Sequence, residues 1–280
     1  MTGGVFILGA GRAGRGLSRA LRASGVKVIG LHGRRAERDP DTVTGGALPA
    51  TISSAEVVLV AVRDGQLDEA LGELAAAALA AGTVALHVSG SAEPSLTALR
   101  AAGHPCGTFH PLVPLADPAR APELLRGAWI GTDGDAGAVA VAEELAATLG
   151  AHTLRIPTGE KAAYHAAAVI ASNFPTVLAA VAAQLMAKIG IDERDAWGAI
   201  RALMRGAVTN LDTELPARAL TGPIARGDAG TVEKHLAALS SEPGVRALYA
   251  TLSVAAVELA RQGGADDGAL GAITRVLREQ

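Results

Sequence analysis

The sequence predicts an α/β protein, with a mostly parallel sheet in its first half and an all-helical domain after it. Three observations lead to this fold class. Short apolar runs alternate with helical patterns up to Pro157, a glycine-rich loop joins the first run to the first helix, and helical periodicity then continues to the C-terminus. We therefore expect two domains, residues 1–157 and residues 158–280.

The composition limits the classes of protein that the chain can represent. A length of 280 residues suits two domains, and a net charge of −3 with 19% charged residues does not favour binding to nucleic acid or to a membrane surface. The single cysteine, Cys106, excludes an internal disulfide framework and is typical of a reducing compartment. Because the N-terminus lacks a basic segment followed by a long apolar run, we expect a cytoplasmic protein without a signal peptide.

The longest apolar run, residues 162–187, is long enough to cross a bilayer. Its tendency to insert is weak, because alanine supplies much of the run and five polar or helix-breaking residues interrupt it: Ser172, Asn173, Pro175, Thr176 and Gln184. We expect a soluble protein with no membrane span.

The glycine-rich loop follows the first apolar run, Val5 to Leu8. It has the pattern GxGxxG, with a strand before it and an amphipathic segment after it. In this setting the first glycine makes a tight turn, the second lets the backbone approach a pyrophosphate, and the third lets helix and strand pack closely. The pattern predicts a Rossmann-type domain with these cofactor-binding residues: Gly9, Ala10, Gly11, Arg12, Ala13 and Gly14.

The end of the second strand distinguishes NAD from NADP. NAD-binding domains usually carry an acidic residue there, whereas this sequence has Arg34 and Arg35, and Glu37 comes later. Guanidinium groups can bind a 2′-phosphate that a carboxylate would repel. We predict NADP as the cofactor, with Arg34 on its 2′-phosphate and Arg35 as a helper; the alternative is that both are solvated loop residues.

Four further strands are expected near residues 57–62, 84–88, 106–109 and 128–131, with a helix over 66–80. Ligands bind beyond the carboxyl ends of the strands in such a sheet. Four more cofactor-binding residues are therefore expected around one crevice: Val62, Arg63, Ser89 and Gly90. The nicotinamide is expected near Ser89 and Gly90.

The histidines of this half divide into two groups. His110 falls at a strand end and is expected to bind substrate, whereas His87 lies inside a strand and is expected to be a satisfied core residue. His104, Cys106 and His110 would share one face of an extended strand, but without a partner motif we expect no metal site.

A helix over 134–150 and a strand over 151–157 complete the first domain. Turn signals then separate a series of helical patterns, which predict helices over 159–173, 176–189, 193–206, 229–240, 243–262 and 266–278.

A polar stripe runs along the first of these helices. Lys161, His165 and Ser172 are spaced so that they lie on one face, with the small Ala168 between them. Tyr164 and Asn173 widen the stripe. Buried polar groups without partners cost roughly 1–3 kcal/mol each, so we expect the stripe to face a ligand, although each residue also has an ordinary structural explanation.

These segments resemble a known family. "GEKAAYHAAAVIASN", "LTGPIARGD" and "TVEKHLAAL" are similar to uncharacterised oxidoreductases that join a Rossmann-like NADP domain to a helical domain of unknown function. That family lies within the wider group of 6-phosphogluconate dehydrogenases, β-hydroxyacid dehydrogenases and ketopantoate reductases. The resemblance implies an oxidoreductase whose helical domain carries substrate-binding residues and forms a homodimer.

The resemblance also implies roles for individual residues. In β-hydroxyacid dehydrogenases the corresponding helix begins with a glycine-led Lys-x-x-Asn-Asn pattern, which Gly159 and Lys161 match and from which Tyr164 and His165 depart. Lys161 would then protonate the forming alkoxide, and the departure leaves His165 open as the donor instead. Asn173 and Ser172 are expected to position the substrate. Arg226 is expected to bind a substrate carboxylate, and the alternative is that it forms a structural ion pair.

The function expected from the sequence is therefore an NADPH-dependent reductase of a small 2-oxo acid, with a ketopantoate-like compound as the expected substrate. Two alternatives stay open. One is an imine reductase of the pyrroline-carboxylate type, which uses the same cofactor on a C=N bond. The other is a non-catalytic protein that senses NADP or binds a partner.

Overall fold

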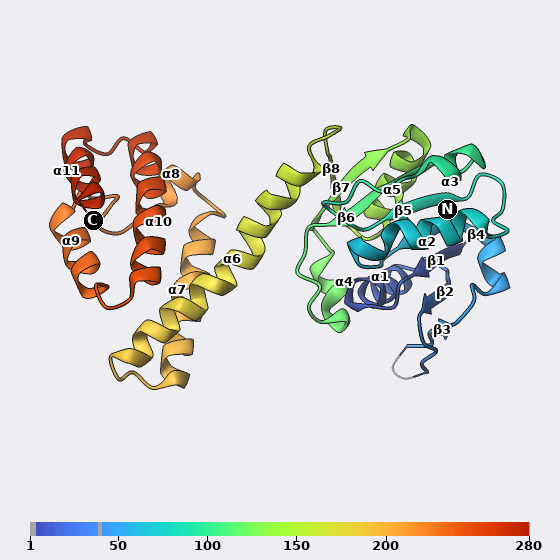
Figure 1. Ribbon diagram of the computed structural model, residues 1–280, viewed down its shortest axis with the longest axis horizontal. Coiled ribbons are helices and arrows are strands. Elements are labelled where there is room, and N and C mark those ends of the chain that lie inside the picture. Colours follow the sequence, from blue (N-terminus) through green and yellow to red (C-terminus); the bar gives the residue numbers. More distant parts are fainter. Residues whose placement is uncertain (1–3, 39–40, 280) are drawn as a thin grey trace. The chain divides into compact units, whose positions relative to one another are not determined.

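The computed structural model describes residues 4–38 and 41–279. The chain divides into two compact units, Met1–Phe174 and Pro175–Gln280, shown as ribbons in Figure 1. The predicted boundary near residue 157 lies in the segment before the long helix α6, Lys161–Lys188. Because the two units divide after Phe174, the first half of that helix belongs to the first unit.

The first unit is built on an eight-stranded sheet with the order β3-β2-β1-β4-β5-β6-β7-β8. All neighbouring strands are parallel except β6 and β7, which run antiparallel. This topology confirms the predicted fold class. The strands are β1 (Gly4–Leu8), β2 (Val28–Gly33), β3 (Thr44–Gly45), β4 (Ala55–Val60), β5 (Val84–His87), β6 (Cys106–Pro111), β7 (Trp129–Gly134) and β8 (His152–Arg155).

Helices cover both faces of the sheet, because the central strands are apolar on both sides. Alternate residues of β1 belong to different cores: Val5 and Ile7 pack in one, Phe6 and Leu8 in the other. The first core includes side chains of α1 (Arg12–Ala23), α4 (Ala121–Leu124) and α5 (Ala136–Thr148), and the second includes side chains of α2 (Leu67–Ala76) and α3 (Thr97–Ala101). Three short 3-10 segments are η1 (Ala50–Ser54), η2 (Asp64–Gln66) and η3 (Pro118–Arg120).

The second unit is helical. Its core gathers apolar side chains of α9 (Ala229–Ala238), α10 (Pro243–Gln262) and α11 (Asp267–Arg278), with Leu236 and Ile273 almost completely buried. The unit also contains α7 (Glu193–Asn210) and the short α8 (Pro216–Ala219). Aspartate side chains accept backbone hydrogen bonds at the starts of α7, α9 and α11, which satisfies N–H groups that the helices themselves leave unpaired.

Helix α6 differs from the prediction. Two helices separated near Pro175 were expected, but the residues form one helix of 28 residues with Pro175 inside it. A proline removes one backbone hydrogen bond, and the alanine residues on both sides favour helix strongly enough to continue past it. Several of its apolar side chains are exposed in this chain, among them Ile170 and Val177 at 60% and 54%.

Helix α6 is the one helix among the described residues whose length and composition would suffice to cross a membrane. Its first turns instead carry Lys161, Tyr164 and His165, which contact the sheet of the first unit. The helix is therefore an element of this fold.

Candidate active site

The glycine-rich loop has the geometry that the sequence pattern predicts. Gly9 has a φ of +116°, and a Cβ atom there would lie 2.3 Å from the Ala61 carbonyl oxygen. A Cβ atom on Gly14 would lie 1.8 Å from the Gly9 carbonyl oxygen, so the start of α1 can approach β1 only without a side chain. A Cβ atom on Gly11 would meet nothing within 4 Å. The first and third glycines are thus required by the fold, whereas the second leaves open space at the N-terminus of α1.

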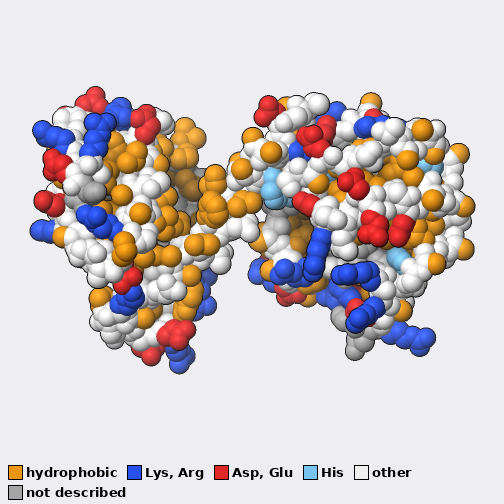
Figure 2. All heavy atoms as spheres, viewed as in Figure 1, with side chains coloured by type: hydrophobic (Ala, Val, Ile, Leu, Met, Phe, Trp, Pro, Cys, Tyr) orange, Lys and Arg blue, Asp and Glu red, His pale blue; other side chains and the backbone are white. Residues whose placement is uncertain are grey.

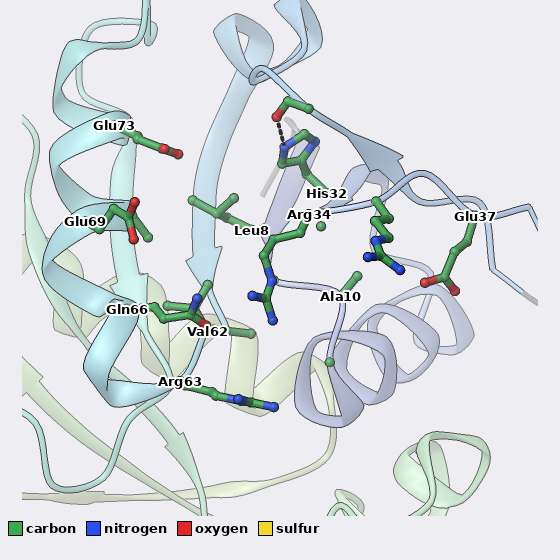
Figure 3. A pocket seen from close by; sticks show the side chains of 17 residues that line it. Leu8, Ala10, His32, Arg34, Glu37, Val62, Arg63, Gln66, Glu69 and Glu73 are labelled. Atoms are coloured by element: carbon green, nitrogen blue, oxygen red, sulfur yellow. Dashed lines mark hydrogen bonds between the residues drawn. The ribbon is translucent and has the colours of Figure 1, made fainter.

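This open space belongs to a pocket of about 890 Å³ beyond the ends of β1, β2 and β4 (Figure 3). Arg34 projects into it from the end of β2, and Figure 2 shows Lys and Arg side chains gathered over the part of the first unit where β2 and β3 lie. Glu37, Glu69 and Glu73 also line it. The predicted cofactor residues that line it are Gly9, Ala10, Gly11, Arg34, Val62 and Arg63.

The other predicted cofactor residues lie next to this pocket or farther along the sheet. Arg12, Ala13 and Gly14 form the first turn of α1, whose N–H groups have no acceptor within the helix. Ser89 and Gly90 follow β5. The Ser91 hydroxyl donates a hydrogen bond to Asp64 (2.9 Å), which joins the loop after β5 to the loop after β4.

A cluster of three aromatic side chains lies beside Gly90. Tyr164 and His165, from α6, each contact His110 of β6 edge-on with ring centroids 5.5 Å apart. Burial, with a smaller effect from His165, lowers the pKa of His110 to about 4, and burial raises the pKa of Tyr164 to about 12. Both are therefore uncharged near neutral pH, and the Tyr164 hydroxyl and His110 Nδ1 form a hydrogen bond of 2.8 Å.

Two glycines make room for this cluster. A Cβ atom on Gly90 would lie 2.5 Å from His110 Cε1 and 2.7 Å from His165 Nδ1, and one on Gly131 would lie 2.2 Å from the Tyr164 hydroxyl oxygen. His165 Nδ1 is buried and has no hydrogen-bond partner among the described residues. Gly131 was not predicted from the sequence, where the only signal was a glycine inside a strand, which often marks a close approach.

Lys161 is buried beneath this cluster. Its Nζ atom lies 3.6 Å from Asp133 Oδ2, 3.5 Å from His87 Nε2 and 3.4 Å from the Ala92 carbonyl oxygen, and the residue is 6% exposed. Burial lowers the pKa of Lys161, and Asp133 opposes that shift. Asp133 could not be predicted as a site residue from the sequence. It reaches Lys161 only through the pairing of β7 with β6, where it stands opposite Thr108.

His87 is not the satisfied core histidine that was expected. Its Nε2 atom faces the Thr108 hydroxyl at 3.2 Å as well as Lys161, but its Nδ1 atom has no partner among the described residues. Burial, followed by the charge of Lys161, lowers the pKa of His87 to about 4. The histidine is therefore buried in its neutral form.

The neutral state of His87 predicts a loss of stability in acid. Because its pKa is lower in the folded protein than in the unfolded chain, where it is about 6.5, the stabilisation is present above pH 6.5 and is lost as the pH falls toward 4. Between about pH 7 and about pH 5, the free energy of unfolding should fall by about 2 kcal/mol less in His87→Gln than in the wild-type protein. Urea unfolding of both proteins at the two pH values tests this. An equal change in the free energy of unfolding between the two pH values would contradict the prediction.

The remaining predicted residues lie elsewhere. Ser172 and Asn173 are exposed on α6, about two turns beyond His165. Arg226 is exposed in the second unit, in the segment before α9. Asp228, the acidic residue two positions after Arg226, caps α9 by accepting hydrogen bonds from the backbone and side chain of Thr231.

The described residues contain no group of three or more His, Cys, Asp and Glu side chains arranged to hold a metal ion. His104 and Cys106 are engaged locally: His104 Nδ1 lies 3.1 Å from the Thr83 carbonyl oxygen, and the Cys106 thiol donates to the His104 carbonyl oxygen. Burial raises the pKa of Cys106 to about 11, which is typical of a structural thiol.

Solved structures share this architecture. A Thermotoga maritima protein matches with 25% identity and a TM-score of 0.72, over 92% of this chain and 98% of its own. A Bacteroides fragilis protein assigned as an NADP oxidoreductase matches with 19% identity and a TM-score of 0.72, over 91% and 98%. The Plasmodium falciparum pyrroline carboxylate reductase with NADP bound matches with 10% identity and a TM-score of 0.62, over 94% and 99%.

Family models match both parts of the sequence, whereas no curated protein matches it. The model of a Rossmann-like domain matches residues 3–111, and the model of a domain of unknown function, DUF2520, matches residues 128–256. The resemblance inferred from the sequence is confirmed: the chain joins a Rossmann-like domain to a C-terminal domain that matches DUF2520.

Proposed function

We propose that this protein is an NADPH-dependent reductase of a small 2-oxo acid. The observation that carries the proposal is the hydrogen bond between Asp64 and Ser91 (2.9 Å). It links the loop at the nucleotide pocket to the loop that holds Gly90 against the aromatic cluster. A dinucleotide that lies along the strand ends would thus reach from this pocket to a group of proton-carrying side chains.

The pocket fits NADPH. Gly11 leaves room for the pyrophosphate at the N-terminus of α1, and Arg34 and Arg35 line the same pocket and can bind a 2′-phosphate. Among the described residues neither arginine has an ion-pair partner, so both charges are available to a ligand. A bound NADPH would supply the hydride.

The proton donor is best assigned to His165. Its ring lies beside Gly90 and His110, at the strand ends, and its Nδ1 atom has no partner among the described residues. An imidazole can release a proton to an oxygen that gains charge during reduction. Lys161, the other expected donor, is buried and surrounded by Asp133, His87 and the Ala92 carbonyl, which supports a role in holding α6 on the sheet.

The substrate class rests on the resemblance to ketopantoate reductases. His110 and Tyr164 are uncharged hydrogen-bonding groups, which suit the carbonyl end of a small oxo acid. Ser172 and Asn173, exposed on the helix that carries Tyr164 and His165, are proposed to position the substrate.

Turnover assays test the proposal. Wild-type protein is expected to oxidise NADPH in the presence of at least one 2-oxo acid from a panel that also contains cyclic imines. His165→Gln should lower kcat by roughly 10²–10⁴-fold, because a positioned acid contributes about that much, whereas Tyr164→Phe should have a smaller effect. Reduction of cyclic imines alone would favour the imine reductase, and NADPH binding without turnover of any substrate would favour the non-catalytic alternative.

We also propose that the protein is a homodimer. Four large apolar side chains on α7 or just after it are more than half exposed: Leu203, Val208, Leu211 and Leu215. Close packing of helices rich in small residues against a second copy of the chain would cover this surface. Sedimentation velocity tests this proposal, and a monomer at micromolar concentration would contradict it.

A further inference from the structure

An ion-pair network lies at the edge of the nucleotide pocket. Arg15, one turn into α1, donates from Nε to the Ala10 carbonyl oxygen at 2.9 Å. Its other guanidinium nitrogens contact Glu37 and Asp41, the latter at 3.3 Å. A single arginine thus joins the glycine-rich loop to two carboxylates that follow β2.

The second carboxylate is itself anchored. Asp41 accepts two hydrogen bonds from Arg19, at 3.0 and 3.1 Å, and these bonds lower the pKa of Asp41. Glu37 and Val43 also exchange two backbone hydrogen bonds, at 2.8 and 3.0 Å. Helix α1 therefore holds Glu37 in a defined position in two ways. Arg15 contacts the Glu37 side chain directly, and Arg15 and Arg19 together anchor Asp41, which lies close to Glu37 in the sequence.

Glu37 matters because it lines the same pocket as Arg34 and Arg35 (Figure 3). An unpaired carboxylate at the end of β2 is the feature that favours the ribose hydroxyls of NAD, and it repels the additional phosphate of NADP. Glu37 is about half exposed, and Arg15 places a compensating positive charge directly on it. The negative charge of Glu37 is then offset by Arg15 and does not offset the charges of Arg34 and Arg35.

We propose that Arg15 is a specificity-determining residue, which neutralises Glu37 so that the pocket prefers a nucleotide with a 2′-phosphate. This inference deepens the proposed function and rests on its cofactor. Arg15 acts on the ligand through Glu37 and does not need to touch it. The same contact explains how an acidic residue near the end of β2 can be present in an NADP-binding pocket.

Isothermal titration of the full-length chain with NADP⁺ and with NAD⁺ tests the role of Arg15 without any substrate. Arg15→Gln should weaken NADP⁺ binding about tenfold while NAD⁺ binding changes less, because only NADP⁺ places a phosphate beside the released carboxylate. Loss of the bond to Ala10 would weaken both nucleotides alike, so the ratio of the two affinities isolates the effect of charge. Adding Glu37→Gln to Arg15→Gln should restore the wild-type ratio to within about threefold.

The control is Arg22→Gln, which removes the same charge from the same helix at an exposed position outside the pocket. It should leave the ratio within about twofold. An unchanged ratio in Arg15→Gln, or one that Glu37→Gln does not restore, would overturn the inference. If Arg15→Gln does not fold, Glu37→Gln alone decides, since it should raise the preference for NADP⁺ and a fall would overturn the inference. If the wild-type protein binds neither nucleotide, the proposed function itself fails.

Discussion

Gly90→Ala is expected to lower kcat/KM of the reductase at least about 100-fold, since even small misplacements of catalytic groups have effects of that size. The new methyl group would lie 2.5 Å from His110 Cε1 and 2.7 Å from His165 Nδ1, so both rings must move. The hydrogen bond between Tyr164 and His110 would be disturbed with them. Steady-state kinetics with the best substrate of the panel measures the effect.

The matched control for this substitution is Gly72→Ala, in α2, where an added Cβ atom would meet nothing within 4 Å. It should retain turnover and gain roughly 0.5–1 kcal/mol of stability, as expected for alanine in place of glycine within a helix. Thermal unfolding of both variants separates a local rearrangement from a loss of folded protein. Wild-type turnover in Gly90→Ala would show that the aromatic cluster does not take part in the reaction.

Gly11→Ala is expected to weaken NADP⁺ binding at least about tenfold while the free energy of unfolding stays the same or rises. The backbone of Gly11 is extended, with a φ of −75°, and an added Cβ atom would meet no protein atom within 4 Å. The methyl group would instead occupy the space that the pyrophosphate needs. Calorimetric titration and urea unfolding of the same preparation measure the two effects.

Gly14→Ala supplies the contrast, because its Cβ atom would lie 1.8 Å from the Gly9 carbonyl oxygen and the protein itself should lose stability. Unchanged NADP⁺ affinity in Gly11→Ala would mean that the nucleotide does not bind across this loop. Equal stability losses in the two variants would contradict the separate roles assigned to the two glycines.

Most of the fold could be predicted because its signals are local. The strands are short apolar runs, and α7, α9 and α11 begin at aspartate caps such as Asp228 and Asp266, which stand directly before the helix. The antiparallel pairing of β7 with β6 could not be predicted, because strand direction depends on the path of the whole chain. The continuity of α6 through Pro175 was also missed, since a local rule for proline was outweighed by strong helix formers on both sides.

The candidate site divides in the same way. The glycine-rich loop and Arg34 follow one another along the sequence in a known pattern, so they could be placed at one pocket beforehand. Asp133 and Gly131 could not, because they meet Lys161 and Tyr164 only through the register in which β7 pairs with β6. The role of Arg15 likewise depends on a side chain that crosses from α1 to the residues after β2.

Titration of the wild-type protein with NADP⁺ and NAD⁺ is the most direct test of the central claim that the first unit is an NADP site. We predict saturable binding of NADP⁺, with NAD⁺ at least about tenfold weaker, because Arg34 and Arg35 can add charge-assisted contacts only for the 2′-phosphate. Equal or tighter binding of NAD⁺, or no binding of either nucleotide, would contradict it.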